Sequence, residues 1–144
     1  QFAIALWDVK RQRLVLARDR VGIRPLFYLW DQGRLLFASE VKAIAAVAAR
    51  TPQIDVHGLA QVFTYWGTVG PQTVFSGIRA VPPGCMLTIE RGVERLSEYW
   101  DWQFPEAGNA AAMSFEDAAV QLRELLVDAV RLQLRADCGR TRRY

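Results

Sequence analysis

Short apolar runs separated by polar turns predict four β-strands in the first forty residues. The runs cover residues 2–8, 13–19, 26–30 and 34–39. Residues 2–8 are apolar on both faces, so this segment is predicted to be a strand that is covered on both sides. Because only a polar turn at 10–12 separates the first two runs, we expect them to form an antiparallel hairpin.

Two helices and a second hairpin are predicted to follow these strands. Residues 40–49 are rich in alanine and predict a short helix, which Pro52 prevents from continuing. Asp55 is a candidate N-cap for a second helix that reaches about residue 66. Residues 85–89 and 93–100 then predict a final hairpin, because a Glu-Arg-Gly turn separates two strand-like runs.

The most regular helical pattern lies beyond a segment of linker composition. Residues 104–112 are rich in Pro, Gly, Asn and Ala and predict a domain boundary. A helix is then expected over residues 114–136, where Ser114 and Asp117 have the spacing of a capping box. Its apolar residues recur at intervals of three and four, and they are Phe115, Ala118, Ala119, Leu122, Leu125, Leu126, Ala129 and Val130.

The composition is that of a globular protein and excludes several classes. The chain has 144 residues, of which 51% are hydrophobic and 23% are charged. Its longest run without Asp, Glu, Lys or Arg, residues 56–78, contains four glycines and a proline, which argues against a membrane-spanning helix. The chain begins with Gln1 inside an apolar run, so we interpret it as a fragment of a longer protein.

The basic residues are concentrated at one end of the chain. Residues 131–144 contain five arginines and one aspartate, whereas residues 1–130 contain 13 basic and 14 acidic side chains. A nucleic-acid interface is expected to group basic residues with aromatic residues on a folded face. Because the basic cluster lies at the end of the chain instead, we predict no nucleic-acid partner, and the sequence likewise indicates no membrane partner.

The cysteines and the histidine give no sign of a metal site. Cys85 and Cys138 are too few for a disulfide scaffold, and neither has a metal-ligand neighbour at a short spacing. We interpret them as reduced thiols of a cytoplasmic protein. The single histidine, His57, lies where a helix is expected to begin, which favours a surface or capping role.

Charged and turn-forming residues gather where two of the predicted strands end. Charges at strand ends either line a pocket or form buried structural pairs, and we favour the structural interpretation. The residues are Arg18, Asp19, Arg20, Gly22 and Pro25 after one strand, and Ser39 and Glu40 after another in the same predicted sheet region. The aromatic residues at 99–102 are interpreted as a packing patch. No glycine-rich phosphate loop is present, and no Ser or Cys has an obvious base as a partner.

Five segments of the chain resemble one enzyme family, both in their amino-acid sequences and in their order along the chain. They read FAIALWD, LVLARDRVGIRPLFY, LLFASEVKAI, TVFSGIRAVPPGCML and YWDW. The segment RDRVGIRPL alone also resembles other class II glutamine amidotransferases. The combination with the following VPPG, YWD and helix resembles the glutamine-hydrolysing asparagine synthetases, over residues 1 to about 137.

This resemblance implies an α+β fold made of parts of two domains. Residues 1–103 would be the second half of a glutaminase domain of the Ntn-hydrolase type, an αββα sandwich of antiparallel sheets. Residues 104–112 would be the linker, and residues 113–137 would include the first helix of an ATP-dependent α/β synthetase domain. Residues 138–144 form a basic tail that resembles nothing in the family, and we expect a shifted reading frame or an artificial end to have produced it.

The resemblance also implies the chemistry of the parent enzyme. Such an enzyme hydrolyses glutamine with an amino-terminal cysteine and uses ATP and magnesium to amidate aspartate to asparagine. Neither Cys85 nor Cys138 matches that nucleophile, so we assign no catalytic, cofactor-binding or metal-binding residue and expect the isolated chain to be inactive. The resemblance implies only structural roles near the glutamine pocket, for Arg18, Asp19, Gly22, Pro25, Ser39 and Glu40.

Two other interpretations stay open at this point. The first is a related amidotransferase or a β-lactam synthetase-like enzyme on the same scaffold, because the residues that select the acceptor would lie in the synthetase domain. The second is a non-catalytic domain that binds a partner through the apolar stripe of the helix at 114–136. For the parent enzyme, the expected substrates are glutamine, aspartate and ATP, in a cytoplasmic protein that forms a possible homodimer.

Overall fold

The computed structural model describes residues 1–106 and 113–134, which belong to two compact units. The first unit, Gln1–Trp102, contains two sheets and two helices, and the described residues of the second, Gln103–Tyr144, form one helix. The predicted linker lies partly outside the described residues, and the predicted tail at 138–144 lies wholly outside them.

The larger sheet of the first unit has four antiparallel strands in the order β1-β2-β6-β7. These strands are β1 (Ala3–Asp8), β2 (Arg13–Arg18), β6 (Cys85–Glu90) and β7 (Val93–Glu98). The two hairpins predicted from the sequence, β1–β2 and β6–β7, are therefore confirmed. Pairing between β2 and β6 then joins the hairpins into one sheet.

The smaller sheet has three antiparallel strands in the order β4-β3-β5. These strands are β3 (Phe27–Asp31), β4 (Arg34–Ala38) and β5 (Arg79–Ala80). The sequence pattern predicted the first two and missed β5, because a strand of two residues leaves no hydrophobic period to detect. The three strands lie in a different sheet from β1 and β2, which corrects the expectation of a single sheet region.

Two-residue turns set the register of two of these hairpins. Arg91 and Gly92 join β6 to β7 with φ values of 52° and 78°, and Gln32 and Gly33 join β3 to β4 with 48° and 77°. Consecutive left-handed residues match the right-handed twist of the flanking strands. Glycine adopts this conformation without a steric penalty, so the two glycines specify where the strands reverse.

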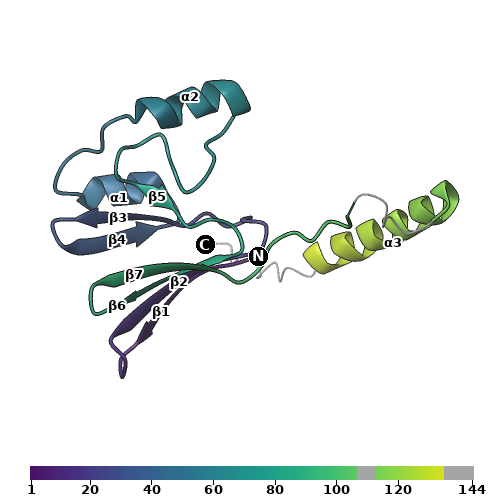
Figure 1. Cartoon of the computed structure of the whole chain (residues 1–144), viewed down its shortest axis with the longest axis horizontal. Helices are drawn as coiled ribbons and strands as arrows, with labels where there is room; N and C mark the ends of the chain where they lie inside the picture. Colours follow the sequence, from purple (N-terminus) through teal and green to yellow (C-terminus); the bar gives the residue numbers. More distant parts are fainter. Residues whose placement is uncertain (107–112, 135–144) are drawn as a thin grey trace, which may run out of the picture. The chain divides into compact units, whose positions relative to one another are not determined.

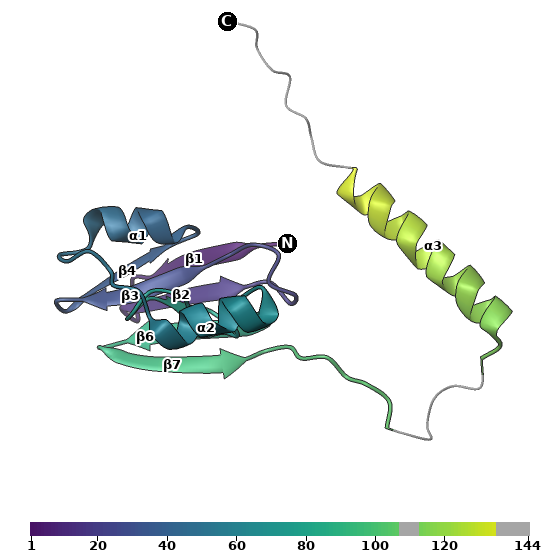
Figure 2. The same ribbon diagram turned by 90° about the horizontal axis from the view of Figure 1, so that it is seen from above.

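The helices α1 (Val41–Val47) and α2 (Val56–Tyr65) complete the first unit and agree with the predicted segments. The predicted N-cap of α2 is confirmed, because the Asp55 carboxylate accepts a hydrogen bond from the Gly58 N–H at 3.0 Å. The helix α1 packs against β4 and β3, on the side of the smaller sheet that faces away from the larger one (Figure 1). Figure 2 shows the same neighbourhood of α1 and β4 from above.

The main core lies between the two sheets. Its buried residues come from both sheets, the position just before β3 and the segment between β5 and β6, and they are Leu16, Leu26, Tyr28, Val81, Cys85, Leu87 and Ile89. Leu16 and Leu87 are fully buried. Burying an aliphatic side chain of this size contributes roughly 1.5–3 kcal/mol. This contact fixes how the two sheets face each other.

The prediction that the first strand is covered on both sides is wrong for the part of the chain that the structure describes. Ile4 and Leu6 are 44% and 54% exposed on one face of β1, and Trp7 is 52% exposed on the other. The reason is that β1 contacts only β2 among the described helices and strands, so none of these elements packs as a layer over its faces.

The second unit contains α3 (Phe115–Gln133), which begins as predicted. The Ser114 hydroxyl accepts a hydrogen bond from the Asp117 N–H at 3.0 Å and donates one to the Asp117 carboxylate at 2.8 Å. None of the residues of α3 is buried, so its predicted apolar stripe is exposed. No helix among the described residues is long and apolar enough to cross a membrane.

Candidate functional site

The buried carboxylate of Asp19 organises the chain where β2 ends. Asp19 is only 4% exposed and accepts hydrogen bonds from the backbone N–H groups of Ile23 at 3.0 Å, Arg24 at 3.0 Å and Phe2 at 3.2 Å. Burial by itself raises the pKa of Asp19. The backbone hydrogen bonds, including one from Gly22, together outweigh burial and lower the pKa to about 2. Asp19 is therefore ionised at neutral pH and holds the following bend closed.

Arg18 makes the complementary set of contacts with backbone carbonyl groups. Its guanidinium donates to the carbonyl oxygens of Gly22 at 2.8 Å, Val81 at 2.9 Å and Arg24 at 3.0 Å. Burial lowers the pKa of Arg18, and the charge of Asp19 opposes that effect. Arg18 thus links the bend after β2 to the segment before β6, which is more than sixty residues away in the chain.

Two glycines let these segments approach closely. Gly22 has a φ of 70°, and a Cβ atom there would lie 2.8 Å from Pro83 Cγ and 3.0 Å from Arg18 Nη2. Gly84 has a φ of 64°, and a Cβ atom there would lie 2.1 Å from the Trp100 carbonyl oxygen. Both positions therefore require glycine for two reasons, the left-handed backbone and the lack of space.

Gly84 and Tyr99 complete a corner that the sequence pattern only partly predicted. The Gly84 N–H donates to the Asp19 carbonyl oxygen at 3.0 Å, and the Tyr99 N–H donates to the Gly84 carbonyl oxygen at 2.8 Å. The Tyr99 hydroxyl donates a short hydrogen bond to the Arg18 carbonyl oxygen. We call the set of Arg18, Asp19, Gly22, Gly84 and Tyr99 the Asp19 corner. Nothing in the sequence near residue 19 indicates that Gly84 and Tyr99 are the partners of this bend.

The other predicted site residues lie in different surroundings. Pro25 is half-buried just before β3, close in sequence to the Asp19 corner. Ser39 and Glu40 are exposed where β4 ends, in the smaller sheet. Glu40 forms an ion pair with Lys42 at 2.6 Å, and its side chain does not cap α1. That any of these residues borders a glutamine pocket stays a prediction.

Cys85 has the properties of a packing residue. The thiol is buried, and burial raises its pKa, with a further contribution from the carboxylates of Glu98 and Asp101. A nucleophilic cysteine needs the opposite shift, toward the thiolate. Among the described residues, no group of three or more His, Cys, Asp or Glu could hold a metal ion.

The aromatic cluster after β7 packs against itself. The rings of Trp100 and Trp102 meet edge to face with their centroids 4.8 Å apart, and the Arg20 guanidinium lies 5.8 Å from the centre of the Trp100 ring. These contacts agree with the predicted packing patch.

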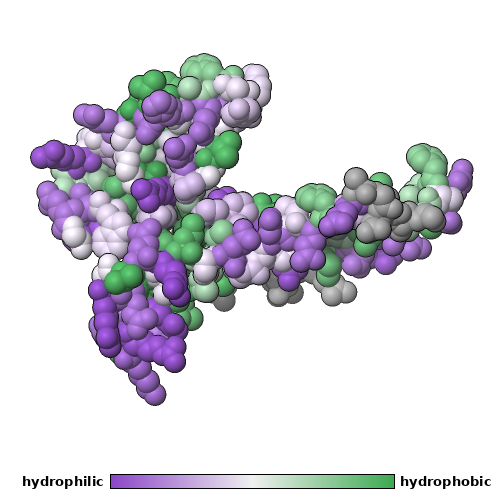
Figure 3. All heavy atoms as spheres, viewed as in Figure 1, coloured by the Kyte–Doolittle hydropathy of each residue, from purple (hydrophilic) through white to green (hydrophobic). Residues whose placement is uncertain are grey.

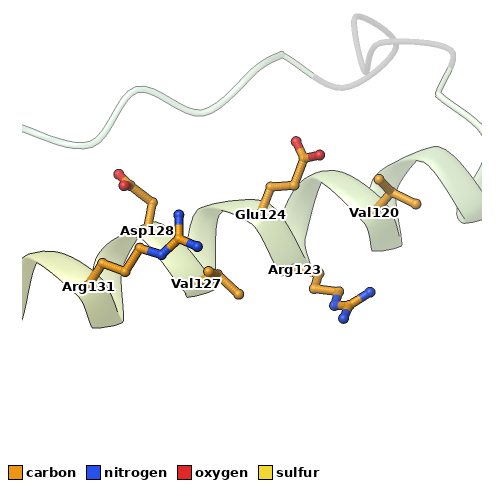
Figure 4. Close-up of a pocket in the computed structure, with 6 residues that line it drawn as sticks. All are labelled: Val120, Arg123, Glu124, Val127, Asp128 and Arg131. Atoms are coloured by element: carbon orange, nitrogen blue, oxygen red, sulfur yellow. The ribbon is translucent and has the colours of Figure 1, made fainter.

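A hollow of about 350 Å³ on α3 offers no enclosed site. Figure 4 shows Glu124 and Asp128 pointing to one side of the helix while Arg123 points away from them. All the residues that line the hollow belong to α3, and all are exposed. A reaction centre needs a desolvated, convergent set of groups, which this surface lacks.

The hydrogen bonds of the Asp19 corner give it a structural role. The Arg18 guanidinium donates three hydrogen bonds and the Asp19 carboxylate accepts three, and every one of these bonds has a backbone group as its partner. Such an arrangement fixes the relative position of β2, the bend before β3 and the start of β6.

The comparison with protein families gives one match over most of the chain. Residues 1–100 match the family model described as a glutamine amidotransferase domain. This segment includes both sheets, α1, α2 and the Asp19 corner.

Several curated relatives match nearly the whole chain. Asparagine synthetase [glutamine-hydrolyzing] 3 of Bacillus subtilis is 36% identical over 94% of this chain and 22% of its own length. The amidase chyE of Penicillium rubens is 38% identical over 95% of this chain and 20% of its own length. The chain thus spans about a fifth of the length of these relatives.

Proposed function

Because the chain belongs to the glutamine amidotransferase domain family, we propose that it is the glutaminase-side part of a glutamine-hydrolysing asparagine synthetase. The main observation that supports this proposal is the 36% identity to such a synthetase from Bacillus subtilis. This identity extends over 94% of the chain and includes residues of both units. In the proposed parent protein, glutamine is hydrolysed to glutamate and ammonia, and the ammonia displaces AMP from ATP-activated aspartate.

The layers of the first unit support a glutaminase fold of the αββα type. The described residues supply two stacked antiparallel sheets and, on the smaller sheet, the helix α1 (Figure 1). In this proposal, the larger sheet receives the second helical layer from another part of the protein. The helix α3 would then be the first helix of the synthetase domain, which is consistent with its exposed apolar stripe.

The Asp19 corner would act in this enzyme as a positioning element. It fixes the bend that carries residues 20–25 through backbone hydrogen bonds to Arg18 and Asp19. A bend held by a buried charge and two glycines resists small displacements of the neighbouring backbone. We infer that this rigidity shapes one wall of the glutamine pocket, together with Pro25, Ser39 and Glu40.

ATP and magnesium belong to the proposed parent reaction and not to the residues described here. These residues contain no carboxylate cluster that fits a metal ion, and the sequence contains no glycine-rich phosphate loop. The residues of this chain contribute structure, and the isolated chain is expected to release no glutamate from glutamine.

A second candidate is a different amide-forming or amide-cleaving enzyme on the same scaffold. The specific observation is the 38% identity to the amidases of Penicillium rubens and Gibberella zeae over 95% of this chain. A β-lactam synthetase-like activity belongs to the same group of alternatives. All of these share the glutaminase scaffold and would differ in the acceptor that the remainder of the protein selects.

We infer a cytoplasmic protein from its two thiols and the absence of a disulfide scaffold, and a homodimer is part of the same proposal.

A segment exchange tests the proposed function. Residues 1–102 replace the matching segment of the Bacillus subtilis synthetase, and asparagine formation is measured with glutamine and, separately, with ammonia as the nitrogen source. The expected result is synthesis from both sources. A chimera that uses ammonia but not glutamine would show that these residues do not support glutamine hydrolysis. A chimera that uses neither is compared by circular dichroism with the parent, and a folded inactive chimera also contradicts the proposal.

A further inference from the structure

One side of the helix α2 is apolar and exposed. Val56, Ala60 and Phe63 recur at intervals of four and three residues, so they share this side of the helix, and Trp66 follows at the C-cap. Val56 is 74% exposed, Phe63 is 81% exposed and Trp66 is 96% exposed. We call these four residues the α2 patch. Figure 3 shows hydrophobic side chains over α2 on the face in view.

The opposite side of α2 is held by the segment that follows the helix. A Cβ atom at Gly58 would lie 2.1 Å from the Thr73 carbonyl oxygen, and the Asp55 N–H donates to the Val74 carbonyl oxygen at 2.9 Å. Among the described helices and strands, none packs against α2. The helix is therefore fixed from one side, while the α2 patch on the other side stays exposed.

The polar side chains beside the α2 patch already have partners within the chain. The Thr64 hydroxyl donates to the Ala60 carbonyl oxygen at 2.9 Å. The Gln61 amide donates to the Gln72 side chain at 2.8 Å and accepts from the Val69 N–H at 2.8 Å. Groups that are paired inside the chain keep their hydrogen bonds when water is excluded. Covering the patch would therefore bury apolar area without breaking these bonds.

The backbone of Trp66 is strained in a way that presents its side chain. Trp66 has φ 60° and ψ 17°, a left-handed conformation that is sterically disfavoured for a large side chain and usual for glycine or asparagine at this position. Its N–H donates to the Val62 carbonyl oxygen at 2.9 Å, so the residue is fixed as the cap of the helix. A strained residue that holds an exposed indole ring indicates a contact made through that ring.

We propose that the α2 patch binds the α2 patch of a second copy of this chain. A two-fold contact places each patch against itself, so a charged patch would repel its own copy. Residues 56–78 contain no Asp, Glu, Lys or Arg, which removes this repulsion. Ala60 lies in the middle of the stripe, and its small side chain lets two helices approach closely.

The exposed area of the α2 patch is sufficient for a weak dimer. Aromatic side chains such as Phe63 and Trp66 bury about 150–250 Å² each when they are covered. With Val56 included, two copies together would bury about 1,000 Å², which is the lower limit for a specific interface. This inference names the surface of the homodimer that is part of the proposed function, and it does not depend on the reaction.

Sedimentation equilibrium of the 144-residue chain, from micromolar to near-millimolar concentration, tests the inference. We expect a monomer–dimer equilibrium with a dissociation constant of about 100 micromolar. Because the contact is uncharged, this constant should change by less than about twofold between low and high salt. Circular dichroism checks that each variant below has the secondary structure of the wild type.

Three variants locate the contact. Phe63→Gln and Trp66→Asn should each raise the dissociation constant at least about fivefold, and asparagine tolerates the left-handed backbone at the cap. Leu125→Gln is the matched control, because Leu125 is an apolar residue that is 64% exposed on α3 and lies outside the patch. This substitution should leave the dissociation constant unchanged.

Cross-linking identifies the occupant of the patch. Ala60→Cys, in a chain that also carries Cys138→Ser, should react with a short bis-maleimide to join position 60 of one copy to position 60 of the other, as peptide mapping by mass spectrometry detects. The control Lys10→Cys, exposed in the turn between β1 and β2, should give no such product. The same Ala60→Cys substitution in the segment-exchange chimera should also cross-link two copies.

The contrary outcomes are distinct. A chain that stays monomeric, an association that weakens at high salt, or one that Leu125→Gln weakens and the two patch variants do not, would each overturn the proposal. A monomeric chimera in which the Ala60→Cys thiol is unreactive would place the α2 patch beneath another part of the protein and overturn it as well. None of these experiments measures glutamine hydrolysis, which the segment exchange tests separately.

Discussion

Substituting Asp19 by Asn tests the idea that one buried charge holds the end of β2. The two carboxylate oxygens accept from the N–H groups of Phe2, Ile23 and Arg24. An asparagine keeps the size of the side chain but offers one acceptor oxygen, and its NH2 group would face backbone donors. The substitution therefore removes the charge, breaks at least one hydrogen bond and leaves a backbone N–H buried without a partner.

The size of the effect follows from the pKa of the carboxyl group. A pKa that falls from 3.8 to about 2 on folding stabilises the folded state by about 2.5 kcal/mol at neutral pH. Because the folded-state pKa is the lower one, this contribution is complete above the unfolded value of 3.8. It is lost as the pH falls through about 2. Asp19→Asn should therefore lower the free energy of unfolding at pH 7 by about 2–3 kcal/mol.

Urea unfolding followed by tryptophan fluorescence in dilute solution measures this effect at pH 7, 4, 3 and 2. The wild-type chain should lose stability over the acid range, while Asp19→Asn, already destabilised, should lose about 2 kcal/mol less between pH 7 and pH 2. Glu98→Gln, an exposed carboxylate on β7, is the matched control and should change stability by less than about 0.5 kcal/mol. An Asp19→Asn variant as stable as the wild type at pH 7, or one with the same acid dependence, would refute the reasoning.

Three further outcomes are expected. Gly84→Ala should destabilise the fold by at least about 3 kcal/mol in the same titration, because its Cβ atom would lie 2.1 Å from the Trp100 carbonyl oxygen. The control Gly92→Ala, with open space around it, should cost about 1 kcal/mol. Equal losses of stability would contradict the close approach at Gly84. Glu94→Gln should lower the free energy of unfolding by about 0.5–1.5 kcal/mol and change the tryptophan fluorescence spectrum. The Glu94 carboxylate accepts hydrogen bonds from Tyr28 at 3.1 Å and Trp30 at 2.7 Å, which link the two sheets. An unchanged stability would show that hydrogen bonds to water replace these two bonds at no cost. Cys85 should react with iodoacetamide at least about tenfold more slowly in the folded chain than in urea, because burial raises its pKa. Peptide mapping by mass spectrometry distinguishes the labelling of Cys85 from that of Cys138. Rapid labelling of Cys85 in the folded chain would contradict a packing role.

Most elements of the fold could be predicted because their causes are local. The turn at Gly92, the cap at Asp55 and the cap at Ser114 each depend on residues within four positions in the chain. Each side chain or backbone preference acts on its immediate neighbours, so the pattern in the sequence carries the full cause. For this reason the predicted strands and helices agree with the structure to within one or two residues at most ends.

The candidate site was predicted only in part because half of its contacts are distant in sequence. Arg18, Asp19 and Gly22 form one local motif, and the sequence identified them together. Their partners Gly84 and Tyr99 meet them only because β2 pairs with β6. Nothing near residue 18 specifies which later strand will lie beside it.

The sequence by itself therefore determined where strands, helices and turns begin and end, and which family the chain resembles. Only the tertiary structure decided that the strands form two sheets, that Leu16 is buried between them while Leu6 is exposed, and that three backbone N–H groups donate to Asp19. The physical reason is that hydrogen bonding within a turn or helix is set by neighbours in the chain. Side-chain burial and strand pairing depend instead on segments that are distant in the chain. These segments come together in the arrangement that removes the most apolar area from water and leaves the fewest polar groups without a hydrogen bond.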